Sequence, residues 1–100
     1  DIYNYHSNKK GYDLYVTGFE WNEYNIEHIA RHHVTPQDVE EACYLSPLIL
    51  KGRSSRYYIL GQSESGRYLA IVIEYKGKGM VKVITARDMD YKERKRYQEK

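Results

Sequence analysis

The amino-acid sequence predicts one α+β domain, with two N-terminal helices and a C-terminal helix packed on a mainly antiparallel sheet. The chain has 100 residues, of which 41% are hydrophobic and 30% are charged, a composition typical of a single globular domain. Two segments with helix-capping signals come before four short strand-like runs, and a third capping signal follows them. Short turns between the strand-like runs favour antiparallel neighbours, and we expect the helices to cover one face of the sheet.

The N-terminal part of the chain is predicted to hold an arm, a strand and a helix. Residues 1–12 are polar, rich in tyrosine and without periodicity, so we expect a loose arm there and a single domain over residues 13–100. Residues 13–20 predict a strand with a glycine bulge near its end. Asn22 is then expected to cap the first helix. The residues predicted on the buried face of that helix recur at helical spacing: Ile26, Ile29, Ala30 and His33.

The second helix has the strongest local signals in the chain. Thr35 is a favourable N-cap residue, and Pro36 takes the first helical position, where its missing N–H costs no hydrogen bond. Asp38 stands at the capping-box position, and Val34 and Val39 have the spacing of a hydrophobic staple. We expect the helix to end before the next proline.

The rest of the chain predicts a β-meander and a final helix. Strands are expected over residues 48–50, 56–61, 67–76 and 80–87. The turns that separate the longer strands, over residues 63–66 and 77–79, are short and contain glycine, as antiparallel hairpins require. Asp90 and Glu93 have capping-box spacing and mark the start of the last helix.

The charge distribution is uneven, although the net charge is only +2. Residues 20–45 carry six acidic side chains and one arginine, whereas residues 46–86 carry seven basic and two acidic side chains. Residues 87–100 carry six basic and four acidic side chains. A basic sheet and tail of this kind suit phosphate or an acidic protein partner, and the alternative is charge mixing for solubility.

Several function classes lack their sequence signals. No apolar run approaches the ~20 residues that a membrane-spanning helix requires, so we expect no membrane contact. The single cysteine, Cys43, excludes an intrachain disulfide and fits a reducing compartment such as the cytoplasm. Its place on the apolar stripe of the second helix predicts a buried thiol. The segment 77–79 is a turn rather than a phosphate-binding loop, and no serine–histidine–acid set has a recognisable context.

The strongest functional signal lies where the last strand meets the last helix. Arg87 ends the strand, and the short basic helix that follows carries Tyr91 and Tyr97. The cationic side chains predicted on this helix to contact RNA are Lys92, Arg94 and Arg96. Guanidinium and ammonium groups bind phosphate, and phenols stack on bases or transfer protons, so this stretch predicts a surface for RNA. The alternative is a solvated helix face without a ligand.

His28 and His32 form a second candidate group, four residues apart on one face of the first helix, with Asn25 on the same stripe. Paired histidines at this spacing can bind zinc, but no HExxH pattern or cysteine pair supplies a third ligand, so we predict no metal site. The alternatives are contact with phosphate or proton transfer near neutral pH, and two polar side chains bonded to backbone or water. Arg56, which opens a strand beside two tyrosines, is a further candidate for RNA contact.

Several short motifs follow one another along nearly the whole chain, over about residues 13–98. They are Phe19-Glu20-Trp21-Asn22, His32-His33-Val34-Thr35, Tyr58-Ile59-Leu60-Gly61, Gly66-Arg67, Ile84-Thr85-Ala86-Arg87, Lys92-Glu93-Arg94 and Tyr97. In this order and spacing they resemble the BrnT family, small bacterial toxins of type II toxin–antitoxin pairs with a RelE-like fold. The chain departs from the family pattern at Asn25, where lysine is frequent, and at His33, where glycine is common.

The resemblance implies a ribonuclease that arrests growth by cutting RNA without metal or cofactor. In such a reaction the 2′-hydroxyl attacks the adjacent phosphate, a base and an acid move protons, and cations stabilise the transition state. By position, the resemblance gives catalytic roles to His32, Arg87, Glu93 and Tyr97. It also implies a DNA-binding antitoxin, expected to be of the ribbon-helix-helix type, and it leaves a homodimer open. The alternative function is a non-catalytic RNA- or protein-binding domain of the same fold.

Overall fold

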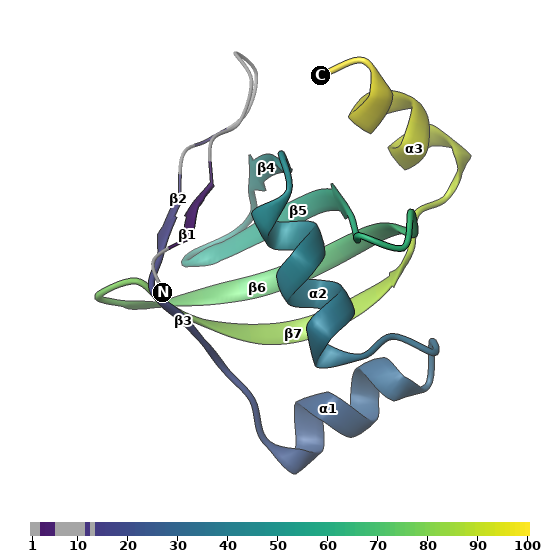
Figure 1. The fold of residues 1–100 in the computed structure, drawn as a ribbon. Coiled ribbons are helices and arrows are strands. Elements are labelled where there is room, and N and C mark those ends of the chain that lie inside the picture. Colours follow the sequence, from purple (N-terminus) through teal and green to yellow (C-terminus); the bar gives the residue numbers. More distant parts are fainter. Residues whose placement is uncertain (1–2, 6–11, 13) are drawn as a thin grey trace.

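The computed structural model describes residues 3–5, 12 and 14–100, and its centre is a five-stranded sheet (Figure 1). The helices are α1 (Glu23–Ala30), α2 (Pro36–Tyr44) and α3 (Tyr91–Gln98). The strands are β1 (Tyr3–Tyr5), β2 (Leu14–Val16), β3 (Gly18–Glu20), β4 (Leu48–Lys51), β5 (Arg56–Gln62), β6 (Tyr68–Gly77) and β7 (Met80–Asp88). No helix in the described part of the chain is both long enough and apolar enough to cross a membrane.

The predicted antiparallel meander is confirmed. Strands β4, β5, β6 and β7 are successive antiparallel neighbours in the sheet order β3-β7-β6-β5-β4. Strand β3 pairs with β7 in parallel, so the sheet is mainly antiparallel, as expected. The β6–β7 turn holds Gly77, Lys78 and Gly79 at φ values of 97°, 54° and 81°. Glycine adopts this left-handed backbone without steric cost, which explains its place on both sides of Lys78.

The single strand expected over residues 13–20 is wrong, because the chain bends at Thr17 and forms two strands. Strand β2 pairs with β1 in a small separate sheet, whereas β3 joins the central sheet beside β7. The Thr17 N–H donates to the Gly79 carbonyl at 2.7 Å, and the Thr17 hydroxyl donates to the Lys78 carbonyl at 3.0 Å. The β6–β7 turn therefore fixes the bend, and no glycine bulge is needed.

The loose arm expected over residues 1–12 lies largely outside the described residues. Within it, strand β1 pairs with β2 in antiparallel register. The Tyr12 N–H donates to the Ile49 carbonyl of β4 at 2.8 Å. The described part of this segment therefore contacts the small sheet and the edge of the large one.

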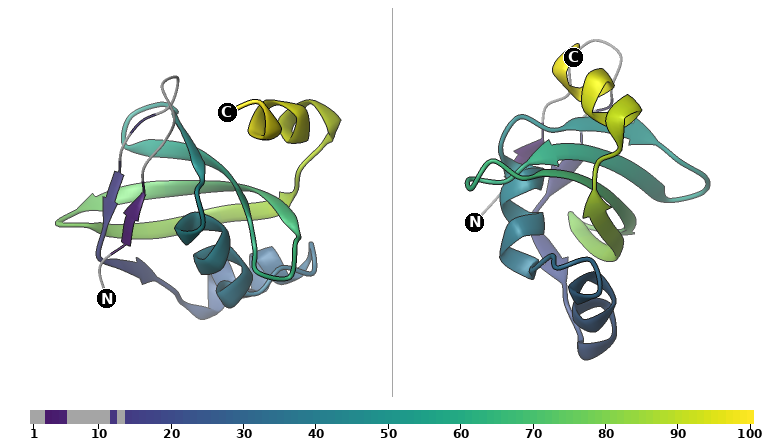
Figure 2. Two further views of the ribbon diagram at one scale, coloured as in Figure 1. Left: turned by 45° about the horizontal axis from the view of Figure 1, so that its top comes forward. Right: turned by 90° about the vertical axis from the view of Figure 1, so that its right-hand side faces the viewer.

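The central sheet separates two hydrophobic cores (Figure 2). Helices α1 and α2 lie over one face, and α3 lies over the other. Alternation along β6 explains the division, because Leu69 and Ile71 enter the main core and Ala70 faces α3. The buried residues of the smaller core are Leu48, Leu60, Ala70 and Tyr97. The expectation that the helices share one face is therefore wrong for α3.

The buried face of α1 also differs from the predicted one. Ile29 is fully buried, as expected, but Ile26, Ala30 and His33 are exposed. Asn25 is buried in their place, with 2% of its surface exposed. The helix is therefore rotated relative to the orientation that its apolar residues predict.

Asn25 is buried because its side chain satisfies its hydrogen bonds inside the protein. Its amide nitrogen donates to the carbonyls of Glu20 at 2.9 Å and Val83 at 3.2 Å. Its side-chain oxygen accepts from the Asn22 N–H at 2.9 Å, and the Asn22 side chain accepts from the Asn25 N–H at 2.9 Å. A buried polar group with partners costs little free energy, so this amide fixes the start of α1 against β7.

All three predicted helix starts are confirmed. The N-cap residues are Asn22, Thr35 and Asp90, and each forms a reciprocal capping box with the third helical residue. Val34 and Val39, which have the spacing of a hydrophobic staple, are both buried in the main core. Local capping chemistry thus determines where each helix begins.

Helix α2 packs so closely on β5 that its backbone meets Gly61. A Cβ placed at Gly61 would lie 2.9 Å from the carbonyl carbon of Ala42 and would overlap the carbonyl oxygen. Glycine is required here because any side chain would push the helix away from the sheet.

We expect Gly61→Ala to lower the free energy of unfolding by ~1–3 kcal/mol, because the rigid backbone of α2 must move to admit the methyl group. Urea unfolding followed by circular dichroism measures the change. Gly18→Ala is the matched control, since a Cβ at Gly18 meets only the flexible end of Met80, at 3.0 Å. Equal stability of the Gly61→Ala variant and the natural protein would contradict the close approach.

Candidate functional site

The centre of the candidate site is an ion pair between Arg87, near the end of β7, and Glu93, in the first turn of α3. The Arg87 guanidinium donates to both Glu93 carboxylate oxygens, at 2.8 and 2.9 Å, and to the Asp88 carbonyl at 3.1 Å. The Arg87 side chain is 43% exposed and the Glu93 side chain 13% exposed. The pair therefore presents a cation to solvent and keeps its carboxylate mostly covered.

The carboxylate of Glu93 also has a structural task. It accepts a hydrogen bond from the Asp90 N–H at 2.9 Å, while the Asp90 side chain accepts from the Glu93 N–H at 2.8 Å. Glu93 thus joins the N-terminus of α3 to the end of β7. Within the described residues, the contacts of Arg87 use three of its five N–H donors, which leaves two for an anion.

Tyr97 lies one turn after Glu93 and is buried, with 7% of its surface exposed. Its ring meets the Tyr68 ring edge-on, with centroids 6.0 Å apart, and its hydroxyl donates to the Ser46 carbonyl at 3.4 Å. Burial raises the pKa of the Tyr97 phenol, and the neighbouring Tyr68 raises it further. Tyr97 is therefore a neutral phenol that anchors α3 and is closed to substrate in this arrangement.

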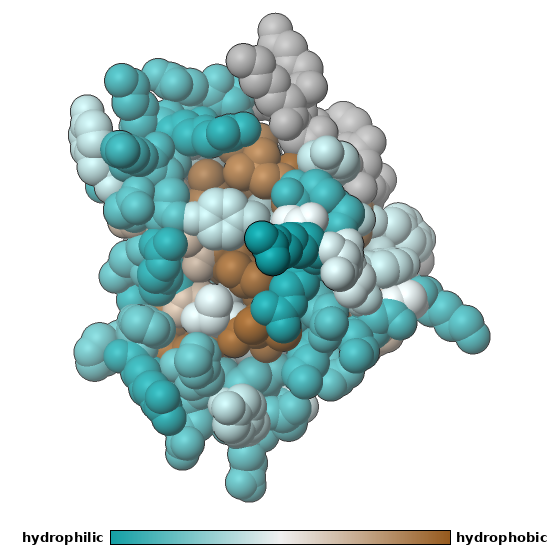
Figure 3. Space-filling model, turned by 180° about the vertical axis from the view of Figure 1, so that it is seen from behind, coloured by the Kyte–Doolittle hydropathy of each residue, from teal (hydrophilic) through white to brown (hydrophobic). Residues whose placement is uncertain are grey.

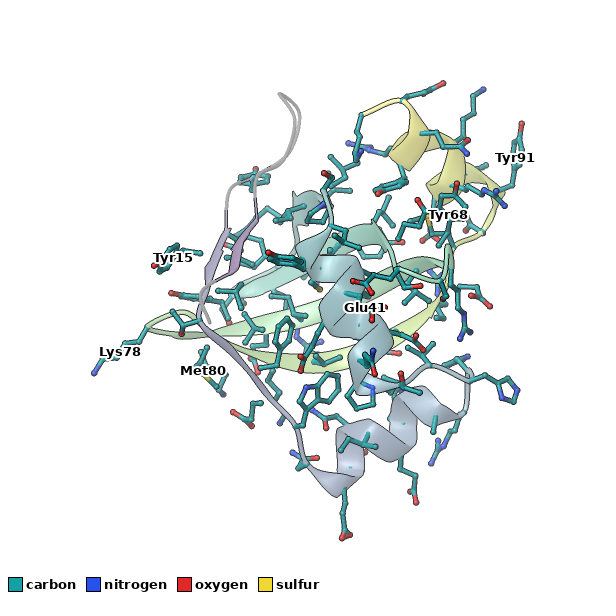
Figure 4. All side chains as sticks on the ribbon, in the orientation of Figure 1. Tyr15, Glu41, Tyr68, Lys78, Met80 and Tyr91 are labelled. Atoms are coloured by element: carbon teal, nitrogen blue, oxygen red, sulfur yellow. The ribbon has the colours of Figure 1, made fainter. Side chains whose placement is uncertain are left out.

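The predicted RNA-binding residues of α3 lie along its exposed surface. Arg94 stacks on Tyr68, with the guanidinium carbon 4.0 Å from the ring centroid. Lys92 and Arg96 are exposed, and Tyr91 is 80% exposed and points away from the body of the protein (Figure 4). These cations lie on the same helix as Glu93, the partner of Arg87.

His28 and His32 lie at the C-terminal end of α1, on the other side of the sheet from α3. Their rings meet at 71° with centroids 6.5 Å apart; His28 is half-buried and His32 exposed. Within the described residues, no group of three or more histidine, cysteine, aspartate or glutamate side chains is placed to hold a metal ion. Each imidazole has two ring nitrogens that can take part in hydrogen bonds.

Arg67, which was not predicted from the sequence as a site residue, connects the segment just after α1 to the end of β7. Its guanidinium donates to the carbonyls of His32, at 2.7 Å, and His33, and to the Asp88 carboxylate at 2.7 and 3.3 Å. The hydrogen bond from Arg67 lowers the pKa of Asp88. Sequence patterns miss this residue because its partners lie 21 to 35 positions away, and the only signal was its place in a family motif.

The structure brings the predicted catalytic residues together only in part. Arg87 and Glu93 are in direct contact, and Tyr97 follows on the same helix but is covered. His32 reaches this end of β7 only through Arg67 and Asp88. Because successive side chains of a strand leave opposite faces, Arg87 and Asp88 point to different sides of the sheet.

An open face of the sheet extends away from Arg87 on the α3 side. Cross-strand pairs place its side chains in three rows, which are Leu60, Ala70 and Arg87; Tyr58, Val72 and Thr85; and Arg56, Glu74 and Lys82. Helix α3 covers the first row, through Tyr97. Figure 3 shows this face, where hydrophobic atoms remain visible between polar margins.

In comparisons with known proteins, no family model, no curated protein and no solved structure matches this chain. A functional assignment therefore depends on the chemistry of the residues themselves and on the order of their motifs.

We expect stability to depend on pH through Asp88. Because its pKa is lowered in the folded state, the unfolded chain takes up the proton first as the pH falls below the usual aspartate value of ~3.9, and stability is lost in that window. Asp88→Asn should be less stable than the natural protein at about pH 7, and this difference should shrink at about pH 3.

Urea midpoints at the two pH values measure the effect of Asp88→Asn. Glu27→Gln is the control, because Glu27 is exposed and has no hydrogen bond or ion pair within the described residues. A difference between Asp88→Asn and the natural protein that stays constant with pH would show that the Asp88 charge does not stabilise the fold.

Proposed function

We propose that this protein is the toxin of a type II toxin–antitoxin system, similar to the BrnT family and RelE-like in fold, and that it arrests growth as a ribonuclease. One observation supports the proposal most directly. Arg87 is a half-exposed guanidinium with two free donors, held at the junction of a strand and a basic helix. Bidentate guanidinium groups recognise phosphate, and the surrounding cations favour a polyanion.

The proposed reaction is an attack of the RNA 2′-hydroxyl on the adjacent phosphorus, which expels the 5′-oxygen of the next nucleotide. A base accepts the 2′ proton, and an acid gives a proton to the leaving oxygen. Arg87 stabilises the charge that accumulates on the phosphate, and Glu93 orients the guanidinium. We assign proton transfer to His32, because an imidazole can accept and donate a proton and because Arg67 ties the His32 carbonyl to the same end of β7.

A second function, binding RNA or protein without catalysis, is favoured by two features of the site. Glu93 occupies the two donors of Arg87 that would suit a phosphate best, and Tyr97 is buried. Either function uses the same basic surface. RNA cleavage by the purified chain separates them, because the binding domain would retain RNA affinity without producing fragments.

The proposed partner is a cognate DNA-binding antitoxin of the ribbon-helix-helix type, in the cytoplasm. An inhibitor need only cover Arg87 and the exposed cations of α3 to block phosphate binding. The basic surface suits an acidic segment of such a partner, and attraction between exposed charges speeds association at low salt.

We expect Arg87→Ala to reduce RNA cleavage by ~10²–10³-fold, because the main contact to the transition-state charge is lost. Purified protein is incubated with end-labelled RNA in EDTA, and fragments are quantified on a gel. Lys78→Ala is the matched control, since Lys78 lies in the β6–β7 turn, four residues from the nearest side chains of the open face, Glu74 and Lys82. Full cleavage by Arg87→Ala, or cleavage only after zinc is added back, would contradict this role.

We expect His32→Ala to reduce cleavage more than His28→Ala does, although the two side chains share one helix face. The reason is that His32 lies at the end of the helix that Arg67 ties to Asp88. Cleavage rates of the two variants on end-labelled RNA measure the difference. Equal rates for the two variants would remove His32 from the mechanism.

A further inference from the structure

An open pocket lies at the far end of the sheet face from Arg87. Its volume is about 610 Å³, and the residues that line it include Arg53, Arg56, Tyr58, Val72 and Glu74. It spans the second and third rows of the open face and the turn between β4 and β5. No residue of α3 is among those that line it.

Two guanidinium groups of this pocket have no bonded partner in the part of the chain that the structure describes. Within the described residues, neither Arg53 nor Arg56 has a side-chain hydrogen bond or an ion pair. This distinguishes them from Arg67 and Arg87, which are held by carboxylates. Free guanidinium groups beside an open pocket are suited to an anionic ligand.

The turn that carries these arginines is well fixed. The Lys51 ammonium donates to the carbonyls of Ser54 and of Gly52, the latter at 3.4 Å, and lies 4.8 Å from the Tyr57 ring centroid. The Gly52 N–H donates to the Arg56 carbonyl at 2.8 Å. These bonds fix the backbone that carries the two arginines, which lowers the entropy lost when the turn binds a ligand.

We propose that Arg53 and Arg56 form a second phosphate subsite, so that one single strand of RNA runs from Arg87 across the open face to this pocket. The inference rests on the proposed function and extends its substrate to a strand of several nucleotides. The row of Arg87 and the row of Arg56 are four residues apart along β6, or ~13 Å at the usual rise of a strand. A single nucleotide does not cover that distance, whereas a short strand does.

The middle row lies between the two phosphate subsites and would contact the RNA there. Tyr58 and Val72 are cross-strand neighbours there, and Tyr58 is half-buried and lines the pocket. Stacking of a base on an aromatic ring contributes ~1–3 kcal/mol without regard to base identity. Glu74 is the one acidic side chain of the pocket, and its pairing with Lys76, at 3.8 Å, offsets its repulsion of phosphate.

The test compares two RNA probes that cannot be cleaved because 2′-O-methyl groups replace the attacking hydroxyls. One is a dinucleotide and the other a hexanucleotide, and binding is measured by titration at several salt concentrations. We expect Arg53→Ala/Arg56→Ala to weaken hexanucleotide binding by tenfold or more and to leave the dinucleotide unchanged. The slope of log K against log salt should fall by ~0.7 for each arginine removed.

Two further variants separate a subsite from a general effect on the fold. Glu74→Gln should strengthen hexanucleotide binding, because it removes a repelling charge from the pocket. Lys78→Ala, in the turn at the end of the sheet, should leave the affinity for both probes unchanged. If a substitution disturbed the fold, that variant would bind both the dinucleotide and the hexanucleotide more weakly.

The experiment distinguishes failure of the proposed RNA path from failure of the proposed ribonuclease activity. Equal losses for both probes, or none for the hexanucleotide, would overturn the second subsite even if the natural protein cleaves RNA. The expected length dependence without any cleavage of unmodified RNA would support the path and reject the ribonuclease. Absence of binding to either probe would reject both.

Discussion

The arrangement of both sides of the site depends on one guanidinium. Arg67 bonds the carbonyls of His32 and His33, just beyond α1, to the Asp88 carboxylate at the end of β7. These carbonyls have no partner in the helix, and water would have to satisfy them if Arg67 were absent. Asp88 follows Arg87 directly, so the same contact fixes the strand end from which the Arg87 side chain leaves. Truncation of Arg67 would therefore disturb the helical side and the α3 side together.

Capping and turn chemistry could be predicted from the sequence, because they depend on residues a few positions apart. The N-caps, the meander and the helix starts follow from such local rules. The rotation of α1 could not, since counting apolar residues gives no weight to Asn25, whose partners Glu20 and Val83 are supplied by tertiary structure. The split at Thr17 was missed for the same reason, because the turn that fixes it is about sixty residues away.

The candidate site shows the same division. Arg87 was predicted from its place at a strand end, and Glu93 was named as a site residue only through the family resemblance, so their direct contact is seen only in the structure. The pocket lined by Arg53 could not be predicted from the sequence, because it forms only when the β4–β5 turn lies beside β6. The φ of His33 is 60°, in the left-handed region that favours glycine, and this backbone conformation was not predicted from the sequence.

Helix α3 carries part of the candidate site, but few contacts attach this helix to the sheet. It has eight residues, too few for a stable isolated helix, and Tyr97 is its one buried residue. Its docking therefore depends on the Tyr97 ring, the stacking of Arg94 on Tyr68 and the bond from Arg87 to Glu93. A phosphate that draws Arg87 away from Glu93 weakens the third of these contacts, so phosphate binding and the position of α3 are thermodynamically linked. A ligand that instead holds α3 against the sheet stabilises the ion pair and opposes phosphate binding.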